Sequence, residues 1–170
     1  SGATVHVVDT FAYDADTDVS DILVIGPGPG DPTDMTHPRM QRIQQIIQTV
    51  KARNKPILGI CLGHQSLAVS EGLEVARQDQ SSQGLQREVK VFGRLRRLGF
   101  YNSFSPVFSE KARERVDLRM DLDEHNRIVA MRGDRFIGFQ FHPESVMSED
   151  GNDVMYRALM ILRQLSSLAT

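Results

Sequence analysis

A five-residue segment at residues 59–63, GICLG, constrains the fold of this chain more than any other segment. It overlaps the end of an apolar run at residues 56–60 (PILGI), which predicts a buried strand. Residues 62–71 then predict a helix that is stopped by Gly72. A glycine on each side of Cys61 allows the backbone to turn sharply between the two elements. The segment therefore predicts strand, tight turn and helix, a building unit of α/β proteins.

Strand and helix patterns alternate through the first half of the chain. Residues 4–9 (TVHVVD) predict a strand, and residues 21–25 (DILVI) predict a buried strand that stops at a Gly/Pro cluster. Pro38 suits the first position of a helix, which Asn54 and Lys55 end. One face of that helix is apolar: Met40, Ile43, Ile46, Ile47 and Val50. Such alternation predicts parallel strand pairing.

The second half is richer in strands. Strands are predicted at residues 73–77, 87–92, 128–132 and 136–141, and Gly133-Asp134 predicts a hairpin turn between the last two. Residues 154–165 predict a final amphipathic helix, capped by Asp150 or Asn152. The predicted fold class is α/β, with an open mixed, mostly parallel sheet flanked by helices.

Composition narrows the function classes. The 170 residues suit one domain, and a net charge of −2 gives no reason to expect nucleic acid or an anionic membrane as partner. One cysteine excludes a disulfide within the chain and indicates a reducing, cytoplasmic compartment. There is no apolar run as long as a membrane span and no signal-peptide pattern at the start. Six arginines predict either a solvated face or a docking surface for another protein: Arg94, Arg96, Arg97, Arg113, Arg115 and Arg119.

Cys61 has the setting of a nucleophile. A sharp turn before a helix lifts the thiol out of the sheet and sets it at a helix N-terminus, where the thiolate is favoured. The same turn aims backbone N–H groups, such as that of Leu62, at a developing oxyanion. The alternative is a lone buried cysteine that acts as a small apolar side chain.

The segment FHPE at residues 141–144 supplies a base and a group that orients it. Pro143 favours an extended backbone at His142, so the side chains of His142 and Glu144 face the same side. Glu144 can then hold one ring nitrogen while the other faces Cys61. The alternative is an exposed loop histidine beside a solvated carboxylate.

The Gly/Pro segment at residues 26–32, GPGPGDP, is a loop rather than a nucleotide-binding motif. It lacks the terminal Gly-Lys-Ser/Thr of a Walker A loop. Pro29 and Pro32 remove N–H donors that a dinucleotide fingerprint requires. A rigid loop in which the backbone N–H of Gly28 approaches a ligand suits an oxyanion hole, and a plain tight connection is the alternative.

Together, GPGPGDP, GICLGHQ (residues 59–65) and QFHPES (residues 140–145) resemble the three signatures of class I, triad-type glutamine amidotransferases. The resemblance implies a flavodoxin-like fold. It also implies that the protein hydrolyses glutamine. It implies that Cys61 forms a γ-glutamyl thioester, that His142 is the acid and base, and that Glu144 orients His142. It further implies an oxyanion hole and a set of glutamine contacts. The oxyanion hole would be formed by Gly28 and Leu62, and the glutamine contacts by Gln65, Ser103 and Phe104.

Among subfamilies, the chain resembles the glutaminase part of anthranilate synthase and of 2-amino-2-deoxyisochorismate synthases of phenazine metabolism. Its SQG at residues 82–84 and YNSF at residues 101–104 depart from the usual anthranilate patterns MHG and YHSL. The implied partner is a chorismate-binding synthase that accepts the ammonia and holds Mg²⁺, whereas no cofactor or metal is expected in this domain. The alternatives are a stand-alone γ-glutamyl hydrolase or peptidase on the same scaffold, and a non-catalytic docking module.

The family normally begins with an interior strand and a helix that have no counterpart before residues 4–9. We therefore expect residues 1–170 to be one glutaminase domain of a longer polypeptide. Without that interior strand, residues 4–9 would be left unpaired.

Overall fold

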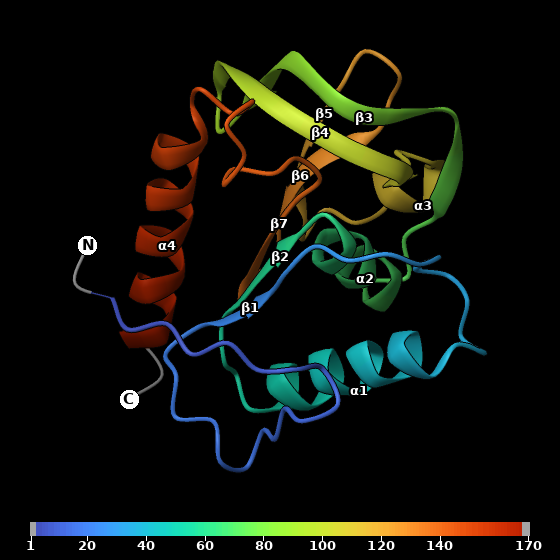
Figure 1. Cartoon of the computed structure of the whole chain (residues 1–170). Coiled ribbons are helices and arrows are strands. Elements are labelled where there is room, and N and C mark those ends of the chain that lie inside the picture. The colour runs from blue at the N-terminus through green and yellow to red at the C-terminus, as the bar shows by residue number, and fades with distance from the viewer. Residues whose placement is uncertain (1–2, 168–170) are drawn as a thin grey trace.

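A five-stranded sheet forms the centre of the computed structural model, which describes residues 3–167 (Figure 1). Its strand order is β1-β2-β7-β6-β5, and β3 and β4 form a separate two-stranded sheet. The strands are β1 Leu23–Ile25, β2 Ile57–Ile60, β3 Val75–Val91, β4 Arg94–Pro106, β5 Arg119–Leu122, β6 Ile128–Arg132 and β7 Phe136–Phe139. The helices are α1 Pro38–Ala52, α2 Leu62–Ser70, α3 Glu110–Arg113 and α4 Gly151–Ser167.

The central sheet is parallel on one side and antiparallel on the other. β1, β2 and β7 pair in parallel, whereas β7 pairs with β6, and β6 with β5, in antiparallel fashion. The predicted mixed sheet flanked by helices is thus confirmed. The hairpin predicted at Gly133-Asp134 joins β6 to β7, and the Gly133 N–H donates to the Phe136 carbonyl at 3.1 Å.

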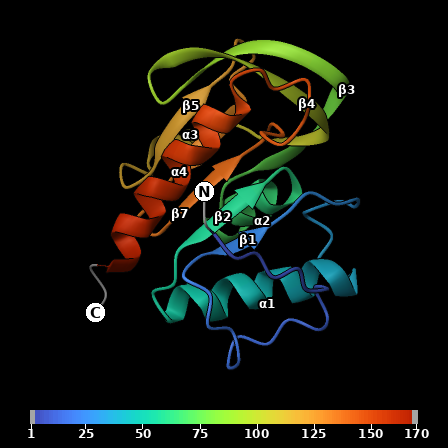
Figure 2. The same ribbon diagram turned by 60° about the vertical axis from the view of Figure 1, so that its left-hand side comes forward.

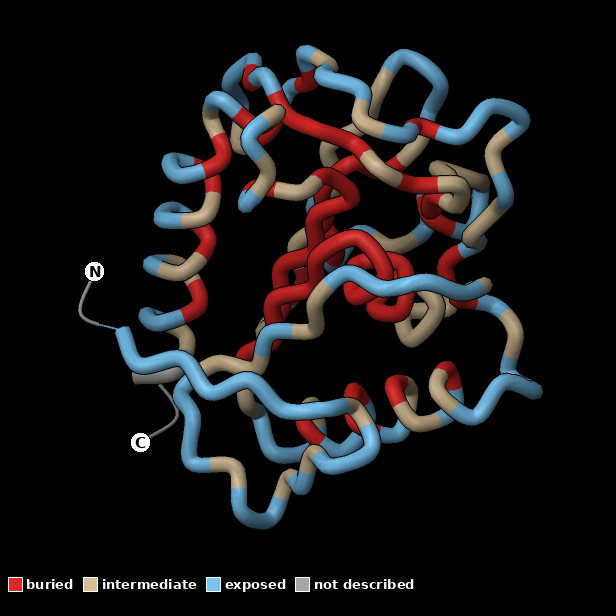
Figure 3. Tube along the Cα trace, viewed as in Figure 1, coloured by how far each residue is buried: buried red, intermediate tan, exposed pale blue. Residues whose placement is uncertain are grey.

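Two apolar cores lie on opposite faces of the sheet. α1 and α2 cover one face, while α4 and the β3–β4 sheet cover the other, as Figures 1 and 2 show. Side chains alternate along β2, so that Ile57 joins the first core and Leu58 the second. Figure 3 shows the buried residues concentrated in the central strands, in α2 and on the inner faces of the other helices. The candidate functional residues lie where the ends of β2 and β7 meet the second core.

The predicted helix after the Gly/Pro loop is confirmed at α1, with Pro38 in its first turn and its apolar stripe buried. His37 caps it, because its ring Nδ1 accepts a hydrogen bond from the Arg39 N–H at 3.2 Å. Asn54, just beyond the end of α1, has a φ of 56° and so turns the chain toward β2. The final helix is also confirmed but begins at Gly151. Asp150 directly precedes the helix, its carbonyl accepts from the Val154 N–H at 3.1 Å, and its carboxylate accepts from the Arg97 N–H at 2.8 Å.

The strand predicted at residues 4–9 is wrong. This segment forms no strand, and its residues are exposed, Val7 to 94%. Its β-branched residues favour extended backbone, but no strand among residues 3–167 pairs with it. The segment crosses the molecule as an extended, exposed trace (Figure 3).

The two strands predicted at residues 73–77 and 87–92 are parts of one long strand, β3, which pairs along its length with β4. Register shifts near Ser82 and Gly84 interrupt the pairing of β3 with β4, so the sequence pattern does not show that the two segments form one strand. Phe92 and Gly93 form the turn with φ values of 52° and 79°, which suits a tight hairpin. The partner strand β4 was not predicted, although it carries Tyr101, Ser103 and Phe104 to the site.

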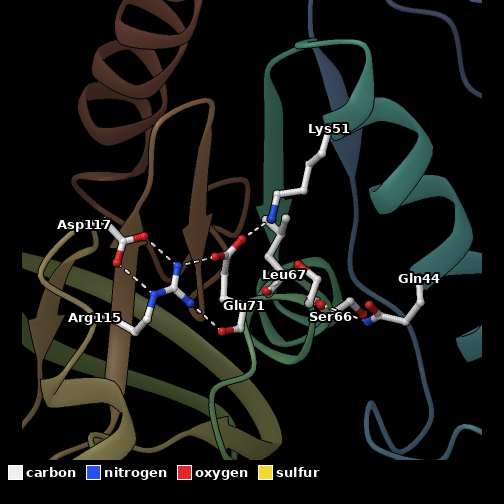
Figure 4. A network of polar contacts seen from close by, with 8 residues as sticks. Gln44, Lys51, Ser66, Leu67, Glu71, Arg115 and Asp117 are labelled. Atoms are coloured by element: carbon white, nitrogen blue, oxygen red, sulfur yellow. Dashed lines mark hydrogen bonds and ion pairs between the residues drawn. The ribbon is translucent and has the colours of Figure 1, made fainter.

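The arginine cluster is not a single solvated face. Arg96 is buried and forms ion pairs with Asp150 and Asp153. Arg115 pairs with Glu71 and Asp117, and Glu71 also pairs with Lys51 of α1. Figure 4 shows this network joining α1, the end of α2 and the segment before β5. Much of the positive charge is therefore neutralised within the molecule.

Candidate active site

Cys61 lies on a strained turn between β2 and α2. Its φ of 52° and ψ of −102° are unusual for a residue with a side chain, which marks a sharp nucleophile-type elbow. The flanking glycines are required by space. A Cβ on Gly63 would lie 2.0 Å from the Ile25 carbonyl oxygen, and one on Gly59 would lie 2.6 Å from the Gly63 carbonyl carbon. The backbone of α2 therefore lies so close to the backbones of β1 and β2 that only glycine fits at positions 59 and 63.

The sheet and the helix together fix the position of the thiol. The Cys61 N–H donates to the Phe139 carbonyl at 2.8 Å, which extends the β2–β7 ladder by one residue. Leu62 begins α2, so its N–H has no partner within the helix. The thiol is thus held beside the positive end of the helix dipole. Cys61 is 6% exposed, which shields it from bulk water.

His142 follows β7 and is held by its backbone. Its N–H donates to the Gly99 carbonyl of β4 at 2.9 Å, and its carbonyl accepts from the Ser148 hydroxyl at 2.6 Å. Ser148 Oγ in turn accepts from the Gly99 N–H at 2.9 Å. This ring of hydrogen bonds ties the segment that carries the imidazole to the β3–β4 sheet. Ser148 was not identified from the sequence, because its role depends on a contact with a distant strand.

The imidazole lies between an acid and the thiol. Nδ1 of His142 donates to Glu144 Oε1 at 2.8 Å, as the spacing of the two residues predicted. Nε2 is buried and has no hydrogen-bond partner among the described residues. Burial lowers the pKa of His142, but Cys61 and Glu144 outweigh burial and raise it to about 9. The His142 ring holds the pKa of Glu144 below its usual range against the effect of burial. The arrangement places a protonatable imidazole between the thiol and an ionised carboxylate.

Tyr101 of β4 packs against the imidazole. The two rings meet edge to face with centroids 5.0 Å apart. The Tyr101 hydroxyl bonds the Ser145 hydroxyl at 2.9 Å, and Ser145 Oγ also accepts from the Met147 N–H at 3.1 Å. This contact fixes the ring against the segment that follows His142. The sequence identified Tyr101 only as part of a subfamily pattern, because its contact with His142 joins two distant segments.

The Gly/Pro loop reaches the beginning of α2. A Cβ on Gly28 would lie 3.1 Å from Leu62 Cδ2, so the Gly28 backbone lies against the side chain of the other predicted oxyanion-hole residue. Their N–H groups remain the predicted donors.

Gln65 points toward β4. Its Nε2 donates to the Phe104 carbonyl at 2.8 Å and to Gln140 Oε1 at 3.3 Å. Gln140 Nε2 lies 3.9 Å from Cys61 Sγ. Gln65, Phe104 and Cys61 are thus connected, and Ser103 neighbours Phe104 on β4. The sequence predicts no role for Gln140, because alternation in a strand says little about the last residue before a loop.

His64 is fully buried on α2 and faces away from the thiol. Its Nε2–H donates to the Ile128 carbonyl at 2.9 Å, and burial lowers its pKa to about 4. The ring is therefore neutral and packs α2 against the sheet. A Cβ on Gly138 would lie 2.5 Å from its Nδ1, so β7 has a glycine where the ring needs room.

Metal-binding and membrane-spanning features are absent from residues 3–167. No group of three or more His, Cys, Asp and Glu side chains in this range is arranged to hold a metal ion. None of the helices in the same range has the length and apolar character that crossing a membrane requires.

Curated proteins are similar to most of this chain. The chain is 34% identical over 158 residues to a phenazine-specific anthranilate synthase of Pseudomonas fluorescens, covering 86% of this chain and 24% of that protein. It is 28% identical to anthranilate synthase component 2 of Helicobacter pylori J99, covering 85% of this chain and 74% of that protein. It thus spans about a quarter of the phenazine-specific relatives.

Solved structures show the same fold. A putative GMP synthase protein from Thermoplasma acidophilum has a TM-score of 0.73 at 16% identity, covering 90% of this chain and 78% of that one. A glutamine amidotransferase from Thermotoga maritima has a TM-score of 0.57 at 19% identity, covering 87% of this chain and 74% of that one. The model of the family described as "Glutamine amidotransferase class-I" matches residues 1–162. The chain belongs to the class I glutamine amidotransferases.

Proposed function

We propose that this chain hydrolyses glutamine through Cys61, His142 and Glu144 and releases ammonia for a synthase. One observation carries the proposal: a thiol on a strained turn at a helix N-terminus lies beside an imidazole whose other nitrogen is bound to a carboxylate. A buried structural cysteine would need neither the strain nor the partner. Membership of the family supports glutamine as the substrate.

The proposed reaction has two stages. The Cys61 thiolate attacks the carboxamide carbon of glutamine, and the resulting oxyanion is bound by the N–H groups of Gly28 and Leu62. As the tetrahedral intermediate collapses, the C–N bond breaks and His142 gives its proton to the leaving ammonia. His142 then takes a proton from water, whose oxygen attacks the thioester carbonyl. Glutamate leaves, Cys61 returns to the thiolate, and the proton stays on His142.

Glu144 keeps the imidazole in one tautomer throughout these steps. Before attack, thiolate and carboxylate both favour the protonated ring, consistent with a raised pKa at His142. Acylation removes the negative charge on sulfur, which makes the ring a better proton donor to ammonia and then a competent base. Gln65 and the backbone of Ser103 and Phe104 are the proposed glutamine contacts.

The proposed ammonia acceptor is a chorismate-using synthase of the anthranilate or 2-amino-2-deoxyisochorismate type. The support is the naming of relatives as phenazine-specific anthranilate synthases and as anthranilate synthase component 2. In this proposal the synthase part binds chorismate and Mg²⁺, and residues 1–170 supply only ammonia.

Glutamine turnover by the complete enzyme tests the proposal. We expect glutamate to form, and to form faster when chorismate is bound to the synthase. A glutamine-analogue electrophile should modify Cys61, as mass spectrometry of the labelled peptide would reveal. Full glutamine turnover without any synthase would instead favour a stand-alone γ-glutamyl hydrolase, and an unlabelled Cys61 would favour a docking module.

The base and its orienting residue should differ in effect. His142→Ala is expected to lower kcat for glutamine hydrolysis by about a thousandfold or more, because proton transfer is lost. Glu144→Gln removes only the charge behind the ring, so the loss should be at least about tenfold smaller. Steady-state kinetics of both variants in the complete enzyme measure the difference, and equal losses would contradict the orienting role.

Tyr101→Phe should lower kcat for glutamine about three- to tenfold, with KM nearly unchanged. The variant keeps the ring beside His142 but loses the hydroxyl bond to Ser145, whose net value is that of one ordinary hydrogen bond. Tyr156→Phe is the matched control, because Tyr156 is exposed on α4 far along the chain from this contact. An unchanged kcat for Tyr101→Phe, or an equal loss for Tyr156→Phe, would show that the hydroxyl does not help to hold His142.

A further inference from the structure

Gln140 is a buried amide beside the nucleophile with no role in the proposed reaction. It is 1% exposed and directly follows β7. Its Nε2 lies 3.9 Å from Cys61 Sγ, within the range of a hydrogen bond to sulfur, and its Oε1 accepts from Gln65 Nε2 at 3.3 Å. A carboxamide buried this deeply requires partners for its polar atoms. The thiol and the second glutamine are those partners.

The backbone of β4 decides which end of Gln140 faces the sulfur. The Phe104 carbonyl oxygen can only accept, so the Gln65 atom 2.8 Å from it is the NH₂ group. The same NH₂ group faces Gln140, which must therefore present its oxygen. The other end of the Gln140 amide, its NH₂ group, then points at Cys61. The Phe104 carbonyl thus orients the amide of Gln65, which in turn orients the amide of Gln140. As a result, an N–H donor of Gln140 faces the Cys61 sulfur.

We propose that Gln140 is a catalytic residue that donates a hydrogen bond to the Cys61 sulfur and stabilises its thiolate form. The inference rests on the proposed role of Cys61 as nucleophile. A donor to the charged form favours ionisation, and its bond is stronger to a thiolate than to a thiol. Because the amide is neutral, it adds this effect without competing for the proton on His142. Gln65 serves as its positioning residue.

The other groups around Cys61 have separate roles. His142 is the titratable group that faces it from the loop after β7, with Glu144 behind the ring. From β4, Tyr101 contacts the His142 ring. From α2, the helix N-terminus faces the sulfur, whereas His64 on the same helix bonds Ile128 on β6. Unlike His142, Gln140 can be replaced by an uncharged residue without changing the charge near the sulfur.

The pH dependence of Cys61 alkylation tests the proposal. Iodoacetamide reacts with the thiolate, so the rate against pH reports the thiolate fraction, and the peptide containing Cys61 is quantified by mass spectrometry. Gln140→Met keeps a long side chain but removes the donor. We expect its rate profile to move upward by about one pH unit, roughly a tenfold loss of thiolate below the midpoint. Gln140→Glu keeps the shape and the acceptor for Gln65, and should move the profile in the same direction and further.

Gln44→Met is the matched control. Gln44 Nε2 donates to the Ser66 carbonyl of α2 at 2.9 Å (Figure 4), so this variant also loses an amide contact to that helix, but not one to sulfur. Its profile should superpose on that of the unchanged protein. If Gln140→Met leaves the profile in place, or if Gln44→Met moves it equally, the proposal is overturned. Alkylation does not require glutamine turnover, so a failed glutaminase assignment would leave this readout intact and distinguishable.

Discussion

Cys61→Ala and Cys61→Ser are expected to abolish glutamine-dependent synthesis in the complete enzyme, by about four orders of magnitude or more. The alanine variant has no nucleophile. The serine hydroxyl is a far weaker one, because the site favours an anion that serine does not form near neutral pH. The turn itself should persist, since its φ is fixed by the glycines and the ladder bond to Phe139 rather than by sulfur.

Free ammonium provides the control for this prediction. Product formation from chorismate and ammonium should proceed in both Cys61 variants at close to the rate of the unchanged enzyme, because the synthase reaction does not use the thiol. Parallel assays with glutamine and with ammonium measure the two rates. Loss of the ammonium-driven reaction would contradict the proposed division of labour between the two activities.

Gly63→Ala is expected to destabilise the protein by about 3 kcal/mol or more. The added Cβ would lie 2.0 Å from the Ile25 carbonyl oxygen, and a backbone atom cannot rotate aside. Either α2 moves away from β1, which opens the first core, or the elbow at Cys61 distorts. Both are overpacking effects at the upper end of their usual range. Urea unfolding monitored by circular dichroism measures the loss.

Gly26→Ala is the matched control for that substitution. Gly26 also lies beside β1, but a Cβ there would meet no atom within 4 Å. Its free energy of unfolding should stay within about 0.5 kcal/mol of the original. If Gly63→Ala were equally mild, the close approach of α2 to β1 would not be what demands glycine at this position.

The sequence predicted the parts of the fold that local patterns determine. β2, the Cys61 turn and α2 were predicted because an apolar run, two glycines and a helical pattern stand side by side. The strand predicted at residues 4–9 was wrong because a strand needs a partner as well as β-branched residues. β4 was missed because Arg96 and Gly99 interrupt its apolar pattern. Arg96 is buried only because Asp150 and Asp153, far along the chain, neutralise it.

The candidate site also has a part that the sequence predicted and a part that it did not. His142 and Glu144 lie two residues apart, so their contact could be predicted from extended geometry. Tyr101 and Ser148 act on His142 across the boundary between β4 and the loop after β7, and Gln140 reaches Cys61 from the neighbouring strand. Nothing local in the sequence specifies which strand crosses above the imidazole. Those contacts required the three-dimensional arrangement.

The hydrogen bond from the Cys61 N–H to the Phe139 carbonyl helps to set the distance between the thiol and the imidazole. Adjacent strands in a sheet are about 4.8 Å apart, and this spacing varies little. Cys61 directly follows β2, and His142 lies three residues beyond Phe139, the last residue of the neighbouring strand β7. Main-chain hydrogen bonding at the centre of the molecule therefore sets where both segments leave the sheet, and the bonds of His142 to Gly99 and Ser148 hold its backbone from there on.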